Sequence, residues 1–428
     1  GTGNLAVAIH NTAIGYKALE DITAGDGNIS MGSYAGSNIT TGSSNIAIGA
    51  YDGTESGALG TNTVGDYNIA IGSGALTTAN ENDNDGTVAI GHAACKVQAG
   101  TGGGQFASAT TAVGYKALLG LTTGVGTTAV GYSAGLSVID ADANTAIGYE
   151  AFNLIAHANA DNNTAIGYQA MKSSGTAANN DASNNVAVGT SALLAITDGD
   201  NNVAVGANAL DAGTTVNNSI AIGKDAMGAV PADQAVEYAI AIGTNAMLGS
   251  GSTTTGINGN IAIGGSAGED LTTGSNNVLI GYASADVLTT GSNNVTLGRH
   301  TLGAATGAAD DNVVIGYNAM SGAVGAEAVI NCVAIGSGAL AGALDSTGAD
   351  EASGTVAIGK SALSTLTDGH GNLAVGYEAL KTENNGDGNT AIGYQALTLT
   401  QGANDNGNTG VGYKALTTLS TGVGNVAV

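Results

Sequence analysis

The 428-residue sequence has little proline, few aromatic residues and little charge, and each shortage excludes a class of protein. A single Pro excludes collagen, which needs abundant Pro beside a glycine at every third position. The only two cysteines, Cys95 and Cys332, are far apart, so they indicate neither a disulfide framework nor a zinc site. No apolar run approaches the ~20 residues of a membrane-spanning helix, and no signal segment opens the chain.

Positively charged residues are few. The sequence has 9 Lys and Arg residues and 34 Asp and Glu residues, which gives a net charge of −25. Nucleic acids and anionic membrane surfaces bind clustered cations. We therefore expect no nucleic-acid partner and no membrane insertion. Hydrophobic residues still make up 43% of the chain, which argues against simple disorder.

Glycine is abundant, with 71 residues, and its placement reveals a repeat. An aliphatic residue followed by Gly recurs 22 times, at intervals of 17 to 23 residues. Ala stands two residues before this Gly in 17 copies, and Ala stands three residues after it in 19. The consensus is Asn-(Val/Ile/Thr)-Ala-Ile-Gly-Tyr-x-Ala-Leu followed by a polar loop. We assign this glycine to a corner of each repeat, as at Gly15, Gly32, Gly49, Gly114, Gly131, Gly148, Gly189, Gly206, Gly264, Gly281, Gly359, Gly376 and Gly393.

The repeat predicts an all-β fold, a parallel β-solenoid (β-roll) of about 22 turns of 17–23 residues each. β-branched residues alternate with small ones before each Gly, which is typical of a strand, and a second short strand is expected to carry the Ala-Leu pair. Residues 1–428 are read as one continuous shaft with super-repeat blocks starting near 11, 110, 185, 260 and 355. Both ends stop within the pattern, so we expect a piece of a longer fibre.

The two faces of the predicted strand are both apolar, one bearing Val, Ile or Thr and the other bearing Ala and Gly. A thin roll can cover only one face from within its own chain. We therefore predict that the β-branched face is buried inside the roll. The Ala and Gly face would then pack against identical chains, in a side-by-side homotrimer.

Two columns of polar or aromatic residues follow the repeat. The Asn four residues before the Gly is predicted to stack into an amide ladder, at Asn11, Asn28, Asn45, Asn68, Asn185, Asn202, Asn277, Asn294, Asn372 and Asn389. Ten of the 14 Tyr directly follow the repeat Gly. Stacking between turns explains this stripe, and sugar binding is the alternative.

No catalytic constellation stands out, so we expect no enzyme, no catalytic residue and no bound cofactor. Calcium is a weaker possibility, because acidic oxygen-rich loops suit that ion. The candidates are Asp83, Asp85, Asp198, Asp200, Asp310, Asp311 and Asp387, for which solvated turns are the alternative. Long loops at Ala79–Gly86, Val97–Thr110, Ser173–Asn184, Gly249–Gly259 and Gly342–Gly354 are expected to form ridges that could contact other molecules.

Asn-Val-Ala-Val-Gly at 185–189 and 202–206, with Ser-Ile-Ala-Ile-Gly at 219–223, resembles the head repeat of trimeric autotransporter adhesins. Those heads are left-handed parallel β-rolls that trimerise. Gly-Asn-Thr-Ala-Ile-Gly-Tyr-Gln-Ala-Leu at 388–397 is similar to shafts of bacteriophage tail fibres. The resemblance covers essentially the whole chain. The minimum repeat of 17 residues exceeds the 14 usual in adhesin heads, and no coiled-coil stalk, membrane anchor or chaperone-like domain is present in this sequence.

These observations favour a non-enzymatic fibre shaft, most of all that of a phage tail fibre, which holds a receptor-binding tip. The expected location is extracellular, on a virion or a cell surface. The expected partners are further copies of the chain and, through the loops, a host-surface glycan or protein. A bacterial adhesin passenger and a calcium-dependent matrix or surface-layer fibre are the alternatives.

Overall fold

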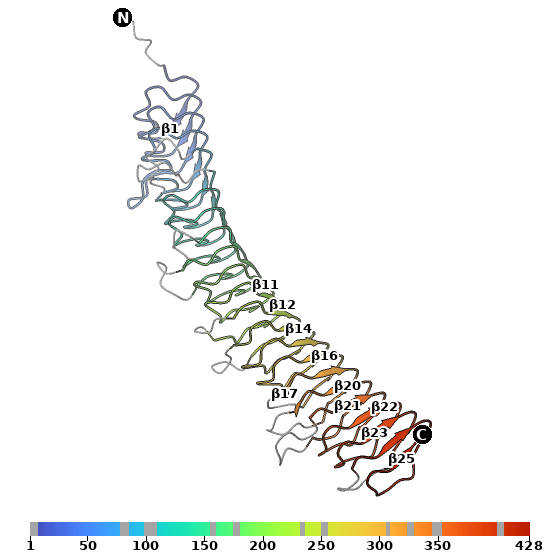
Figure 1. The fold of residues 1–428 in the computed structure, drawn as a ribbon. Helices are drawn as coiled ribbons and strands as arrows, with labels where there is room; N and C mark the ends of the chain where they lie inside the picture. Colours follow the sequence, from blue (N-terminus) through green and yellow to red (C-terminus); the bar gives the residue numbers. More distant parts are fainter. Residues whose placement is uncertain are drawn as a thin grey trace, which may run out of the picture. The chain divides into compact units, whose positions relative to one another are not determined.

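The computed structural model describes residues 7–77, 85–97, 109–154, 160–173, 180–231, 236–249, 256–304, 309–322, 329–344, 353–399 and 406–428. The chain divides into two units, Gly1–Val216 and Asn217–Val428. Within the described residues both units are all-β, and no helix is present that could cross a membrane. Figure 1 shows the short strands of each unit stacked one after another.

The strands of the first unit each have three residues. They are β1 (Thr12–Ile14), β2 (Ile29–Met31), β3 (Ile46–Ile48), β4 (Ile69–Ile71), β5 (Val88–Ile90), β6 (Thr111–Val113), β7 (Thr128–Val130), β8 (Thr145–Ile147), β9 (Thr164–Ile166), β10 (Val186–Val188) and β11 (Val203–Val205).

The second unit has the same construction with small additions at two places. Its strands are β12 (Ile220–Ile222), β13 (Ile240–Ile242), β14 (Ile261–Ile263), β15 (Val278–Ile280), β16 (Val295–Leu297), β17 (Ala309–Asp310), β18 (Val313–Ile315), β19 (Val329–Ile330), β20 (Val333–Ile335), β21 (Val356–Ile358), β22 (Leu373–Val375), β23 (Thr390–Ile392), β24 (Thr409–Val411) and β25 (Val426–Ala427). β17 and β19 pair with each other in a separate two-stranded sheet.

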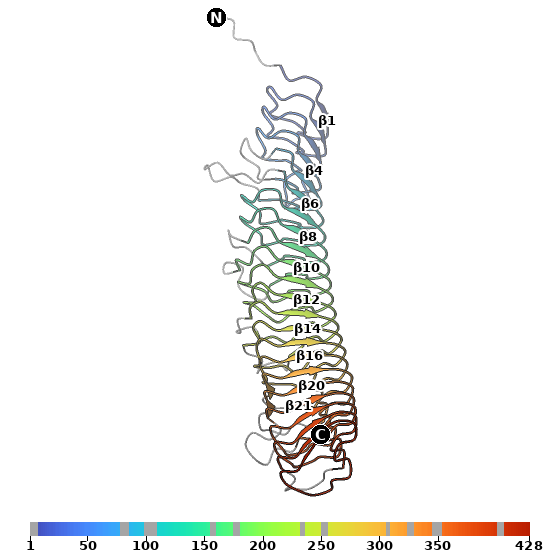
Figure 2. The same ribbon diagram turned by 45° about the vertical axis from the view of Figure 1, so that its right-hand side comes forward.

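Successive strands within each unit pair in parallel and in register, so that equivalent repeat positions lie side by side. Ala129 in β7 pairs with Ala112 in β6 and Ala146 in β8, and Ala241 in β13 pairs with Ala262 in β14. Figure 2 shows these strands lying along one side of the winding chain. The predicted parallel β-solenoid is therefore confirmed, with each of the 22 repeat glycines directly after a three-residue strand.

The segment after each glycine differs from the expected second strand. Every second residue there has a left-handed backbone conformation, as at Lys116 (φ 55°) and Leu118 (φ 49°). This conformation is incompatible with the extended geometry of a strand. The two N–H groups point to opposite neighbours: Lys116 N donates to His92 O (2.9 Å) and Leu118 N donates to Ala134 O (2.9 Å). This side of the coil is therefore a stack of turns that still bonds to both adjacent coils.

The core is built from small and aliphatic side chains at fixed repeat positions. The middle residue of every three-residue strand from β2 onward is buried, and it is usually Ala. The residue four after the Gly is most often Leu or Met, and it is fully buried at Leu118, Met171 and Leu193. A third buried aliphatic residue, seven after the Gly, fills the remaining space, as at Ile39, Leu121, Val138, Ile196, Val230, Leu271, Leu288 and Leu366. This third column was not anticipated from the sequence.

The two cysteines occupy core positions, one in each unit. Cys95 is fully buried, and burial raises its pKa to about 12, while burial raises the pKa of Cys332 to about 11. At pH 8 almost no thiolate forms at either position, and a reagent cannot reach the sulfur. We expect both thiols to react with a disulfide reagent only when their own unit unfolds. Labelling at rising urea concentrations measures this, and rapid labelling in native buffer would contradict the packing described here.

Candidate functional site

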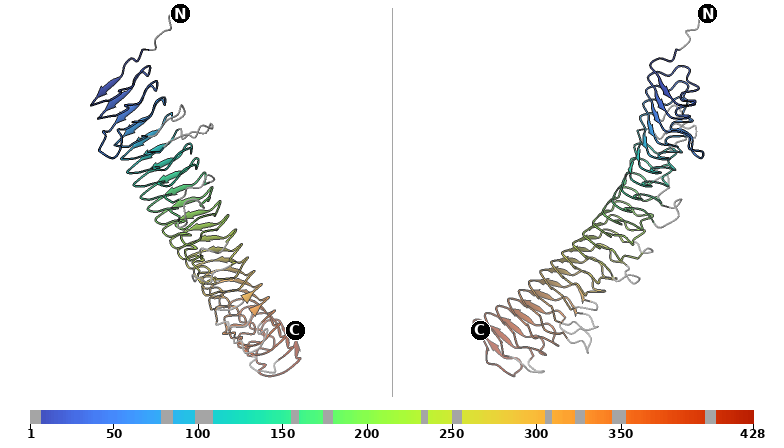
Figure 3. Two further views of the ribbon diagram at one scale, coloured as in Figure 1. Left: turned by 90° about the vertical axis from the view of Figure 1, so that its left-hand side faces the viewer. Right: turned by 180° about the vertical axis from the view of Figure 1, so that it is seen from behind.

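The outward side of the strand ladder differs from the predicted orientation. Ala at the middle strand position is buried in the coil, while the β-branched residues on either side of it are partly exposed on the outside. Figure 3 shows the ladder of strands that carries them from two further sides. Ile147 in β8 and Ile166 in β9 are 38% and 36% exposed, whereas Ala146 is 0% exposed. The prediction that the Ala and Gly face lies outside was therefore wrong, because the buried Leu and Met side chains of the turn stack share the interior with this position, and in most coils a small residue occupies it.

Gly410 in β24 shows how tight the interior is. A Cβ built on Gly410, which stands where other strands have Ala, would lie 3.1 Å from Cγ of Leu397 in the preceding coil. Small residues therefore fill this position in most strands, with Leu279 in β15 and Val314 in β18 as buried exceptions. The three-residue strands contain no charged residue in either unit. The outward face is consequently an uncharged apolar ladder, which we call the branched face.

Stacked aromatic rings run beside the branched face. In the first unit His92, Tyr115, Tyr132, Tyr149 and Tyr168 follow one another with centroid distances of 5.0–5.3 Å and interplanar angles of 6–16°. In the second unit Tyr377, Tyr394 and Tyr413 stack similarly, at 5.1 and 5.4 Å. Offset stacking of this kind stabilises adjacent coils. The rings still keep exposed edges, for example 47% of Tyr132.

An ion pair lies next to the ring stack of the first unit. Lys172 Nζ donates to Glu150 Oε2 at 2.6 Å, and Gln169 Nε2 donates to the same oxygen at 2.8 Å. The Lys172 hydrogen bond lowers the pKa of Glu150, and the Glu150 carboxylate in turn raises the pKa of Tyr149. Tyr149 therefore stays a neutral phenol at physiological pH.

The Asn side chains four residues before each Gly lie inside the coil and join one coil to the next. Asn277 is fully buried, and its Nδ2 donates to Asn260 Oδ1 (3.0 Å) and to Gly291 O (2.8 Å). Its Oδ1 accepts from Asn294 N (2.9 Å) and Asn294 Nδ2 (3.0 Å). Comparable bonds connect further Asn side chains in adjacent coils. The connected groups are Asn11, Asn28 and Asn45; Asn163, Asn185 and Asn202; and Asn372 with Asn389. Asn45 Oδ1 also accepts a hydrogen bond from Asn68 N.

The repeat glycines hold a backbone conformation that other residues rarely adopt, with φ between +126° and +159° in all 22 copies. Most of them, though not Gly412, also lie in close contact with the glycine of the next coil. A Cβ on Gly131 would lie 2.3 Å from the carbonyl oxygen of Gly148, well inside van der Waals contact. The structure thus places these glycines at the corner between the strand and the turn stack.

Four of the calcium candidates occupy one repeat position, six residues before the Gly, and act there as hydrogen-bond acceptors. Asp85 Oδ1 accepts from Asp66 N at 2.7 Å, and Asp200 Oδ1 accepts from Ser183 N at 2.7 Å. Asp310 and Asp387 accept in the same way from Ser292 N and His370 N. This column of Asp, Ser and Asn side chains was missed in the sequence, although its spacing from each Gly is constant.

The other candidates do not converge on an ion site. Asp198 and Asp311 lie in the same bends, where their backbone N–H groups donate to Thr214 O and Ser292 O in adjacent coils. Asp83 lies outside the described residues, as does at least half of each long loop that was expected to form a ridge. Across the ranges that the structure describes, no group of three or more His, Cys, Asp and Glu is placed to hold a metal.

A chelator experiment tests whether calcium contributes to stability. Because the carboxylate oxygens of Asp85 and Asp200 already bind backbone N–H groups, we expect the same thermal midpoint with and without EDTA. Circular dichroism melts with added Ca²⁺ serve as the control. A midpoint that falls in EDTA and recovers with Ca²⁺ would restore calcium as a structural ion.

Comparison with protein-family models and with curated protein sequences finds no match. The function is therefore inferred from the surfaces of the chain itself.

Proposed function

We propose that this chain forms the non-enzymatic shaft of an extracellular fibre, as in a phage tail fibre, by side-by-side association of three copies. The observation that carries the proposal is the branched face. It offers two outward columns of Val, Ile and Thr with no charged residue over eleven three-residue strands in each unit. Parallel sheets are almost always covered on both faces, and among the described residues no second layer of this chain covers the branched face.

A further copy of this chain suits the branched face better than an unrelated protein. Its side chains repeat at the strand spacing of ~4.8 Å, and another copy presents ridges with the same period. Covering the exposed third of one isoleucine contributes roughly 0.5–1 kcal/mol, and each unit offers many such side chains. The number three follows from the resemblance to trimeric adhesin heads. The mechanism is mechanical, because a stack of bonded coils separates a receptor-binding tip from its base.

Paired lysine substitutions test this assembly. Ile147→Lys with Ile166→Lys places charge on the branched face without touching the core, since both side chains point outward. We expect the mass by light scattering to fall to that of one 41.0 kDa chain, with an unchanged circular dichroism spectrum.

Ile139→Lys is the matched control, because Ile139 is 45% exposed in a bend outside the strands. It should leave the assembly intact. If the control and the double variant dissociate to the same extent, the branched face is not the interface. If neither dissociates, the interface lies elsewhere on the chain.

A further inference from the structure

One coil of the first unit carries an insertion at a place where no other coil does. Gly49 and the next repeat glycine, Gly72, are 23 residues apart, and six extra residues stand between Gly49 and the Ala-Leu pair at Ala58 and Leu59. The coil rejoins its normal path at Ala58, whose N–H donates to Gly49 O (3.2 Å), as Ala18 N does to Gly15 O. Elsewhere the extra residues follow the Ala-Leu pair, on the polar-loop side.

The inserted loop is fixed by one carboxylate. Asp52 Oδ1 accepts from Thr54 N (2.9 Å), Glu55 N (2.8 Å) and Thr54 Oγ1 (2.8 Å), and Asp52 Oδ2 accepts from Ser73 Oγ (2.9 Å). These bonds lower the pKa of Asp52, with the Glu55 N–H making the largest contribution. Lys96 Nζ also pairs with Glu55 Oε2 at 2.7 Å. The loop is thus held in one shape before any ligand arrives.

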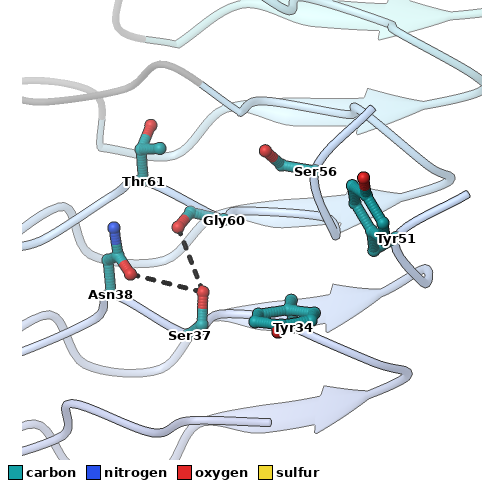
Figure 4. Close-up of a pocket in the computed structure, with 7 residues that line it drawn as sticks. All are labelled: Tyr34, Ser37, Asn38, Tyr51, Ser56, Gly60 and Thr61. Atoms are coloured by element: carbon teal, nitrogen blue, oxygen red, sulfur yellow. Dashed lines mark hydrogen bonds between the residues drawn. The ribbon is translucent and has the colours of Figure 1, made fainter. Parts of the chain in front are cut away.

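The coil that carries the insertion and the coil before it line an open hollow of about 420 Å³. Tyr34 and Tyr51 form one side of the hollow, with ring centroids 5.9 Å apart and ring planes at 67°. Asn38 and Thr61 lie on the other side (Figure 4). The remaining lining is Ser37, Ser56 and Gly60, and Ser37 Oγ donates to Gly60 O at 3.3 Å.

The lining selects a chemical class of ligand. Two aromatic rings suit the C–H face of a sugar, and the amide of Asn38 and the hydroxyl of Ser56 can bond its hydroxyl groups. No lining residue is charged, so a carboxylate, sulfate or phosphate has no cationic partner there, and the chain's net charge of −25 repels anions. The volume falls within the range of ~300–1,000 Å³ usual for small-molecule sites.

We propose that this hollow, which we call the Tyr34–Tyr51 site, binds one ring of a neutral saccharide. The site lies within the first unit and is complete in a single copy. Its function therefore does not depend on assembly of three chains, and the two proposals can fail separately.

Saturation-transfer NMR on the full chain tests the site, with the methyl glycosides of glucose, galactose, mannose and N-acetylglucosamine as probes. We expect transfer to at least one probe, and Tyr51→Ala should weaken its binding by roughly tenfold. Tyr51 is exposed in the inserted loop, so its loss leaves the core intact. Tyr132→Ala removes an equally exposed ring from the regular stack and should leave binding unchanged.

A circular dichroism spectrum equal to that of the unsubstituted chain confirms that each variant is folded. Absence of transfer to all four probes at millimolar concentration would overturn the proposal. Transfer that survives in both Tyr51→Ala and Tyr34→Ala would overturn it as well, because the saccharide would then bind elsewhere.

Discussion

Gly131→Ala is expected to lower the free energy of unfolding of the first unit by more than about 3 kcal/mol, which is a large share of the stability of a typical domain. Two costs combine. Gly131 has φ +142°, a conformation that is strained for alanine. The new methyl group would also lie 2.3 Å from Gly148 O and 2.7 Å from Gly148 C, so the next coil must move away. That movement breaks bonds between the two coils, such as Gly148 N to Val130 O (2.8 Å).

Gly126→Ala is the control in the same repeat. Gly126 also has a positive φ, +68°, but a Cβ there would meet nothing within 4 Å. Gly126→Ala should lower the free energy of unfolding by only about 1 kcal/mol, which is typical for an alanine in a left-handed conformation. Urea unfolding followed by labelling of Cys95 reports the stability of this unit. Equal losses for the two variants would show that close contact between coils is not what requires glycine at the corner.

Asn277→Ala is expected to destabilise the second unit by about 3–5 kcal/mol, because it removes four hydrogen bonds from a buried position. The loss leaves Gly291 O without the Asn277 donor and Asn294 N without its acceptor. Buried polar groups that lose their partners cost their full desolvation energy. The effect should therefore exceed that of removing an exposed amide.

Asn277→Thr provides the matched variant, since the chain itself uses Thr at this position. Thr127 Oγ1 donates to Ala141 O (3.1 Å) and accepts from Asn144 N (3.4 Å), which preserves two of the four bonds. We expect roughly half of the alanine loss, measured by urea unfolding with Cys332 labelling. An alanine variant within 1 kcal/mol of the unsubstituted chain would mean that the ladder adds little net stability.

The strands and their corners could be predicted because their signal is strong and local. β-branched residues before each Gly, repeated 22 times, indicate a strand at that position whatever surrounds it. The parallel order follows as well, because equivalent residues must stack when the period is nearly constant. Three residues before the Gly, every copy has Val, Ile or Thr except one, which has Leu373. Leu373 still forms the first residue of β22.

The orientation of the strand could not be read from alternation, because both of its faces are apolar. Ala146 and Ile147 are equally compatible with an interior position until the width of the coil is known. The width depends on the turn stack, where Leu118 and its equivalents adopt a left-handed conformation. Sequence propensity does not predict such a conformation for leucine. The expected second strand failed for the same reason.

Other features were present in the sequence but were not recognised. The acceptor six residues before the Gly recurs as Asp26, Ser43, Asp66 and Asp85 in successive coils, and each bonds a backbone N–H. The insertion before Ala58 could have been located, because the Ala-Leu pair is displaced by six residues there and in no other copy. The hollow beside it required the positions of side chains from two coils, and only the structure supplies those.

Sedimentation equilibrium of the unsubstituted protein measures directly whether further copies of this chain cover the branched face. We expect a mass three times 41.0 kDa, about 123 kDa, that is independent of moderate dilution. A stable particle of 41.0 kDa, with Ile147 and Ile166 exposed to water, would contradict it.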